Sequence, residues 1–96
     1  MKLGELIILI KRFYDNRGIT EEKNRPRFNA LEKIIVFYKD LSKNNNPEIE
    51  ELFKYNKEMH KALYEKVLNK KLNGAENQVF NDLFKVYSMI NTDEKY

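Results

Sequence analysis

Side chains that could carry out chemistry are few in this chain, and His60 is the only histidine among its 96 residues. A histidine that acts as a general base needs an orienting partner, and one that binds zinc needs further ligands. No Glu-x-x-His pair accompanies His60, and cysteine is absent. We therefore expect no catalytic histidine, no metal site and no cofactor. We expect His60 to lie at the boundary of the core, beside Leu63 and Tyr64.

Acidic residues form three adjacent pairs, Glu21 with Glu22, Glu50 with Glu51, and Asp93 with Glu94. Neighbouring residues point to different sides of a helix, so none of these pairs places two carboxyl groups together as an acid and a base. The sequence also contains no glycine-rich phosphate loop and no nucleophile motif. It predicts a protein that is not an enzyme and has no small-molecule substrate.

Basic residues gather in two groups, one before position 30 and one near position 70. The members are Arg17, Lys23, Arg25 and Arg27 in the first group, and Lys66, Lys70 and Lys71 in the second. The formal net charge of +3, from 18 basic and 15 acidic side chains, is too small to indicate nucleic acid by itself. Cations also stabilise the end of a helix, which gives the second group a structural explanation besides a functional one.

The length of 96 residues fits one domain that spans residues 1–96 and buries a single core. Near the N-terminus only five consecutive residues are apolar, from Leu6 to Ile10. This run is too short for the core of a signal peptide or for a membrane-spanning helix. The absence of cysteine favours a reducing compartment. We expect a cytoplasmic protein.

Glycine and proline are scarce and stand where helices should begin or end. Asn46 followed by Pro47 predicts an N-cap and the first residue of a helix. Asn73 lies three residues before Glu76, which predicts a capping box, and Pro26 predicts a helix that begins close to it. The expected helices span about residues 2–16, 26–43, 47–72 and 75–91.

Apolar residues recur at steps of three and four in each of these segments, which is the spacing of one buried helical face. In the segment 47–72, Asn56 lies on the same face as the apolar residues. These are Ile49, Leu52, Met59, Leu63 and Val67. Because the connections are short, successive helices should pack antiparallel. The predicted fold is all-α, an antiparallel (up-down) four-helix bundle.

The segment from Leu63 to Asn91, LYEKVLNKKLNGAENQVFNDLFKVYSMIN, resembles the C-terminal half of the pediocin-like (class IIa) bacteriocin immunity proteins, the enterocin A immunity family. Its basic stretch and the turn LNGAEN, residues 72–77, are similar to the end of the third helix in that family. The spacing of Leu83, Val86 and Ile90 is similar to that of the fourth helix. Residues before this segment match the family only in their pattern.

The resemblance implies a cytoplasmic bundle that protects the bacteriocin-producing cell from inside. Proteins of this family associate with the membrane components of the mannose phosphotransferase permease once bacteriocin is bound, and they block the lethal pore. The C-terminal half recognises the bacteriocin, and its basic residues would also suit a membrane surface with anionic lipid. The implied partner-binding residues are Lys66, Lys70, Lys71, Asn73, Asn77, Asn91, Lys95 and Tyr96.

Two other functions remain open from the sequence. One is a small basic nucleic-acid-binding or phage-type regulatory protein that uses the basic residues from Arg17 to Arg27, although the small net charge makes nucleic acid the less expected partner. The other is a helical adaptor that assembles with its own copies. Val36, Phe37 and Phe84 are candidates for the exposed apolar side chains that such an assembly needs.

Overall fold

The computed structural model describes residues 1–91, which fold into helices. In chain order these are α1 (Leu3–Asn16), α2 (Arg25–Ser42), α3 (Ile49–Leu52), α4 (Lys57–Leu68) and α5 (Gly74–Asn91). The one strand-like pairing within residues 1–91 is an isolated bridge between Lys2 and Glu48. The all-α class predicted from the apolar spacing is confirmed.

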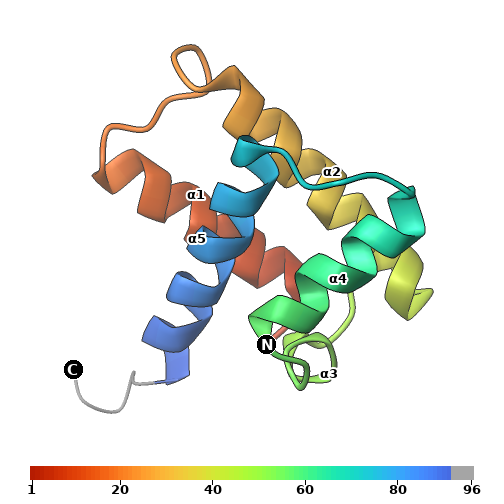
Figure 1. Ribbon diagram of the computed structural model, residues 1–96. Coiled ribbons are helices and arrows are strands. Elements are labelled where there is room, and N and C mark those ends of the chain that lie inside the picture. Colours follow the sequence, from red (N-terminus) through yellow and green to blue (C-terminus); the bar gives the residue numbers. More distant parts are fainter. Residues whose placement is uncertain (92–96) are drawn as a thin grey trace.

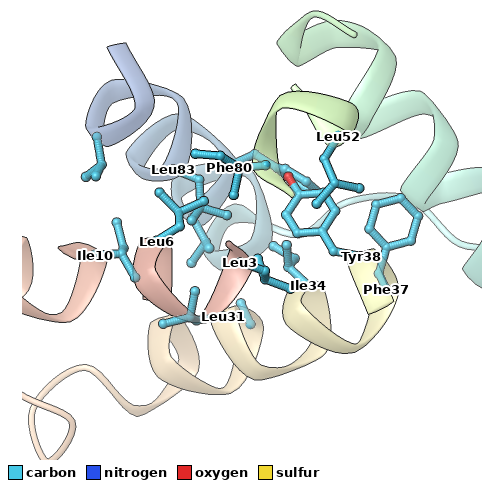
Figure 2. Packing of buried hydrophobic residues seen from close by; sticks show 14 of the residues in the cluster. Leu3, Leu6, Ile10, Leu31, Ile34, Phe37, Tyr38, Leu52, Phe80 and Leu83 are labelled. Atoms are coloured by element: carbon cyan, nitrogen blue, oxygen red, sulfur yellow. The ribbon is translucent and has the colours of Figure 1, made fainter. Parts of the chain in front are cut away.

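The helix α5 is the common packing partner of the fold. It lies closest to α2, α1 and α4, and Figure 1 shows it crossing α1 with α2 and α4 to one side. The buried apolar side chains form one cluster (Figure 2). In that view Leu6 and Ile10 of α1, Leu31 of α2, and Phe80 and Leu83 of α5 gather in the same interior. Residues on α5 are therefore placed to contact each of the other long helices.

Two helix starts, one predicted from a proline and one from a capping box, are confirmed. Pro26 lies in the first turn of α2, after the N-cap Asn24, where a backbone N–H would have no helical partner. Asn73 and Glu76 form the predicted capping box at the start of α5. Both signals are local in the sequence, so the residue at which each helix begins does not depend on how the helices pack.

The single helix predicted for residues 47–72 is wrong, because the structure divides this segment into α3 and α4. Asn56 causes the division: its side-chain Oδ1 accepts a hydrogen bond from the Met59 N–H at 2.9 Å, which makes it the N-cap of α4. The helix α4 ends at Leu68, whereas the predicted helix extended to residue 72. Asn69 follows it with a left-handed φ of 52°.

The helix start predicted at Asn46 and Pro47 is also wrong, since α3 begins at Ile49. The carbonyl of Pro47 instead accepts a hydrogen bond from the Leu3 N–H at 2.8 Å. The side-chain Oδ1 of Asn46 accepts one from the Gly4 N–H at 2.9 Å. The first N–H groups of a helix have no partner within it. Asn46 and Pro47 therefore accept hydrogen bonds from the first N–H groups of α1 rather than beginning α3.

The buried face predicted for α4 is wrong as well. Met59 is 45% exposed, Val67 is 56% exposed and Leu63 is only partly buried. The side chains that α4 buries fully are those of His60 and Tyr64. His60, expected at the boundary, lies inside the core. The helix is therefore rotated so that Met59 and Val67 are exposed, while Leu63 packs against the edge of the core.

His60 joins three helices through its two ring nitrogens. Nε2 lies 2.9 Å from the carbonyl oxygen of Leu52 in α3, and because a carbonyl only accepts, Nε2 must carry the proton. Nδ1 then accepts a hydrogen bond from the Tyr38 hydroxyl of α2 at 2.8 Å. The rings of Phe53 and Phe84 lie around the imidazole, with centroids 5.1 Å and 4.8 Å from it. His60 is thus a neutral, fully bonded core residue.

We expect His60→Ala to lower the free energy of unfolding by more than Leu63→Ala. The first change leaves the Tyr38 hydroxyl and the Leu52 carbonyl without their partner, and each unsatisfied buried group costs about 1–3 kcal/mol. Leu63 is partly exposed, so its loss should fall below the range of about 2–5 kcal/mol for a buried leucine. Urea unfolding followed by circular dichroism compares the two variants. A larger loss for Leu63→Ala would contradict the placement of His60.

Acidification should destabilise the fold through the same residue. Burial lowers the pKa of His60 below its ordinary value of 6.5. The unfolded chain takes up a proton near pH 6.5 while the folded chain resists it, so the stabilisation is present above pH 6.5 and is lost as the pH falls below it. Urea unfolding at pH 7.5 and pH 5.5 should show this loss. The free energy of unfolding should differ less between the two pH values in His60→Gln than in the original protein. An unchanged difference would contradict the assignment to His60.

Candidate functional site

The α4–α5 hairpin, residues 57–91, contains the predicted partner-binding residues that the structure describes. Asn69 ends α4, and the Leu72 N–H donates to the carboxylate of Glu65 at 2.9 Å. The next helix begins with a reciprocal pair: Asn73 Oδ1 accepts from the Glu76 N–H at 2.8 Å, and Glu76 Oε1 accepts from the Asn73 N–H at 3.0 Å. Each side of the turn is therefore fixed by a side chain as well as by the backbone.

Glu76 is the central residue of this turn, although its side chain is only 1% exposed. Besides Asn73, its carboxylate accepts hydrogen bonds from the Tyr64 hydroxyl of α4 at 2.5 Å and from Lys70 Nζ at 2.7 Å. Burial alone would raise the pKa of Glu76, but the bonds from Lys70, Tyr64 and Asn73 outweigh it and hold the pKa below its usual value. The carboxylate is therefore charged and fully bonded.

Lys70 consequently has a structural role among the predicted binding residues. Its ammonium group neutralises a carboxylate that would otherwise be buried without a cation. Lys66 and Lys71 are exposed as Lys70 is, but the ion pair with Glu76 is formed by Lys70. They line a shallow depression together with Glu65, Asn69 and Lys70 itself. The lysines that are available to a partner at this end of the hairpin are thus Lys66 and Lys71.

The predicted binding residues do not form one continuous patch. Asn73 and Asn77 are exposed near the first turn of α5, close to the lysines. Asn91 is the last residue of α5, 14 residues beyond Asn77, which corresponds to about 21 Å along a helix. Figure 1 shows the two ends of α5 on different sides of the molecule. Lys95 and Tyr96 lie outside the described residues.

A second buried carboxylate, Asp82 of α5, holds the helices α1 and α2. It is 4% exposed and accepts a hydrogen bond from the Tyr14 hydroxyl at 2.7 Å. Arg27 of α2 approaches it through Nε at 3.0 Å and through its terminal nitrogen at 2.9 Å, and Gln78 adds a bond at 2.9 Å. Burial, together with the bond to Asp82, raises the pKa of Tyr14. This network is structural in its geometry, since its groups satisfy one another.

The first basic group is divided in the same way as the second. Arg27 is committed to Asp82, and the Arg17 guanidinium lies 3.8 Å from the centre of the Phe13 ring. Lys23 and Arg25 are exposed. Arg17 is exposed as well, so the cations of this group that are open to an anionic partner are Arg17, Lys23 and Arg25.

Sequence reasoning missed Asp82 and the burial of Glu76, although a signal for both was present. Glu76 precedes Val79 and Phe80 by three and four residues, and Asp82 precedes Val86 by four, so both acids share the apolar face of α5. An acid within an apolar stripe must find a cation or several donors. Lys70 and Arg27, the cations that pair with these acids, come from outside α5 and are not identified by that rule.

The described part of the chain offers no group of three or more acidic or histidine side chains arranged to hold a metal ion. None of the helices within residues 1–91 is long and apolar enough to span a bilayer. Comparison with protein-family models, with curated proteins and with solved structures found no match to this chain.

The two adjacent lysines of the turn should respond differently to the same substitution. Lys70→Met leaves the carboxylate of Glu76 without its cation and should lower the free energy of unfolding by about 1–2 kcal/mol, a value reduced because Lys70 is 39% exposed. Lys71→Met should change it by less than about 0.5 kcal/mol, as is usual for an exposed residue. Equal effects in urea unfolding would mean that the ion pair with Glu76 contributes nothing.

Proposed function

We propose that the chain is a cytoplasmic immunity protein of the pediocin-like (class IIa) bacteriocin type. In this proposal it has no enzymatic activity and no cofactor. It protects the producing cell by binding the complex of bacteriocin and mannose phosphotransferase permease at the inner face of the membrane. The observation that carries the proposal is the α4–α5 hairpin, whose sequence resembles the C-terminal half of that family.

The geometry of the hairpin supports a role in contact rather than in chemistry. Glu76 ties Tyr64, Lys70 and the backbone of Asn73 to one carboxylate, which fixes the shape of the turn. Lys66 and Lys71 then extend from a rigid frame, and a rigid frame reduces the conformational entropy lost on binding. An exposed basic end also suits a membrane-embedded partner beside anionic lipid.

The bundle arrangement of the family belongs to the same proposal. In it α1, α2, α4 and α5 are the four antiparallel (up-down) helices, and α3 is a single turn inserted before α4. The packing of α5 against α1 and α4 fits this arrangement, in which these helices are neighbours. The site would then be the turn end of the hairpin, with Lys66, Lys71, Asn73 and Asn77.

Expression of the protein inside a sensitive, permease-bearing Gram-positive cell should protect that cell from one or a few pediocin-like bacteriocins. Protein supplied outside the cell should give no protection, because the contact is cytoplasmic. Growth inhibition across a panel of such bacteriocins measures the effect. Equal killing of expressing and control cells, with the protein folded inside them, would refute the proposal.

The double variant Lys66→Ser, Lys71→Ser should weaken protection while leaving the fold intact, since both side chains are exposed. A loss of about 1.4 kcal/mol in binding would raise the required amount of immunity protein about tenfold. The matched control is Lys11→Ser, Lys85→Ser, which removes two exposed lysines elsewhere. Equal protection by both double variants would exclude the hairpin lysines as the binding site.

A further inference from the structure

A groove lies between the second half of α1 and the last turns of α5. It is at the C-terminal end of α5, away from the turn that joins α5 to α4 (Figure 1). Its volume of about 440 Å³ falls within the range of small-molecule sites, which is about 300–1,000 Å³. The apolar lining of this groove includes Leu9 and Phe13 of α1 and Val86 and Ile90 of α5.

The floor of the groove is built from residues of the core. Phe13 is 7% exposed and Val86 is 4% exposed, so the packing of the helices holds both in place. Leu9 and Ile90 are partly buried and pack against the same core cluster. The apolar surface is therefore preformed, and an alkyl chain can bind to it without a rearrangement of the protein.

The charged side chains that line the groove are both cationic. They are Arg12 and Arg17, and no acidic residue within residues 1–91 belongs to the lining. Neither arginine forms an ion pair in this part of the chain. The amino group of Met1, which also lines the groove, is already paired with Glu48 at 3.2 Å. The groove thus offers two cations that no acid of the described chain neutralises.

Arg17 is held at the groove by a stacking contact. Its guanidinium lies 3.8 Å from the centre of the Phe13 ring. Stacking uses the flat face of the guanidinium, and its N–H donors point outward in the plane, so they stay available to a carboxylate. Arg12 and Asn16 are four residues apart on α1 and are neighbours on its surface. The polar residues of the lining therefore gather at the end of α1, which gives the groove a cationic end.

This lining discriminates between possible occupants. A nucleic acid would stack its bases on exposed aromatic faces, but the ring of Phe13 is buried and lies under Arg17. A second copy paired about a two-fold axis would bring its own Arg12 and Arg17 to the same interface, where like charges repel. A neutral lipid would leave both cations unpaired. A molecule with one apolar chain and one anionic group satisfies both parts of the lining.

We propose that this groove binds a free fatty acid. The alkyl chain lies along Leu9, Val86 and Ile90, and the carboxylate accepts hydrogen bonds from Arg12 and Arg17. The N–H donors of a guanidinium match the two oxygens of a carboxylate, so arginine suits this head group better than lysine would. The site is separate from the proposed immunity role, which uses the turn between α4 and α5.

Titration of the isotope-labelled full chain with decanoate, kept below its micelle concentration and followed by NMR, tests the proposal. The amide signals of Leu9, Phe13, Val86 and Ile90 should shift and give one dissociation constant below about 1 mM. Absence of binding at that concentration would overturn the proposal. Shifts centred on the α4–α5 turn would overturn it as well.

Two further ligands separate the contributions of chain and charge. Acetate carries the carboxylate without the alkyl chain, and 1-decanol carries the chain without the carboxylate. Both should bind at least about tenfold more weakly than decanoate. If 1-decanol bound as tightly as decanoate, the arginines would not recognise the head group. If acetate did so, the apolar floor would contribute nothing, and either result would refute the site.

Arg12→Gln and Arg25→Gln form a matched pair, because both arginines are exposed and Arg25 lies outside the groove. Arg12→Gln should raise the dissociation constant for decanoate about tenfold, which corresponds to about 1.4 kcal/mol, and Arg25→Gln should leave it unchanged. Circular dichroism checks that both variants fold. Equal weakening by the two changes would mean that decanoate responds only to the net charge, which contradicts the proposal.

Asp93 and Glu94, which follow α5 in the sequence, lie outside the described residues and are tested as competitors for the arginines. Decanoate should bind alike to the original chain and to the variant Asp93→Asn, Glu94→Gln. Binding to the variant alone would mean that the acids of the chain itself occupy the groove, and it would overturn the proposal. Protection of cells measures the immunity role, so each of the two proposals can fail without the other.

Discussion

A buried polar atom must keep its hydrogen bonds, and this constraint decides how α4 sits in the fold. His60 and Tyr64 both lie in the core, where an unbonded polar group is costly. Their partners come from α2, α3 and α5, so the bonds fix both the position and the rotation of α4. The structure thereby buries two side chains with polar atoms and leaves Met59 and Val67 outside. Hydrophobicity summed along the helix would favour the opposite rotation.

The helices α1, α2 and α5 were predictable because their local signals agree. In each, apolar residues recur at the spacing of one buried face, and the predicted bounds lie within two residues of the observed ones. The prediction of one helix over residues 47–72 failed because Asn56 falls at the same helical spacing as the apolar residues of that segment. Periodicity does not distinguish an asparagine that caps a helix from one that is buried in it. The burial of His60 depends on Tyr38 and Leu52, which only the tertiary structure brings to it.

The sequence pointed to the hairpin as the candidate segment, but it did not separate the roles of the residues within it. Lys70 and Lys71 are neighbours of one type, and nothing in the sequence around them separates their roles. The difference arises from Glu76, because the packing of α5 places its carboxylate beside Tyr64 and within reach of Lys70. Asn77 and Asn91 are likewise alike in sequence terms, but the length of α5 separates them. A binding residue therefore has to be assigned after the buried ion pairs are known.

The central position of α5 has a consequence for how the chain reaches its native state during synthesis. This helix supplies Glu76 and Asp82, the carboxylates that pair with Lys70 and Arg27, and it packs on α1, α2 and α4. A nascent chain that lacks it holds the hydroxyls of Tyr14 and Tyr64 and two cations without their acceptors. Folding of the earlier helices is thus incomplete until α5 leaves the ribosome, and until then their apolar faces are open to chaperones and to other nascent chains.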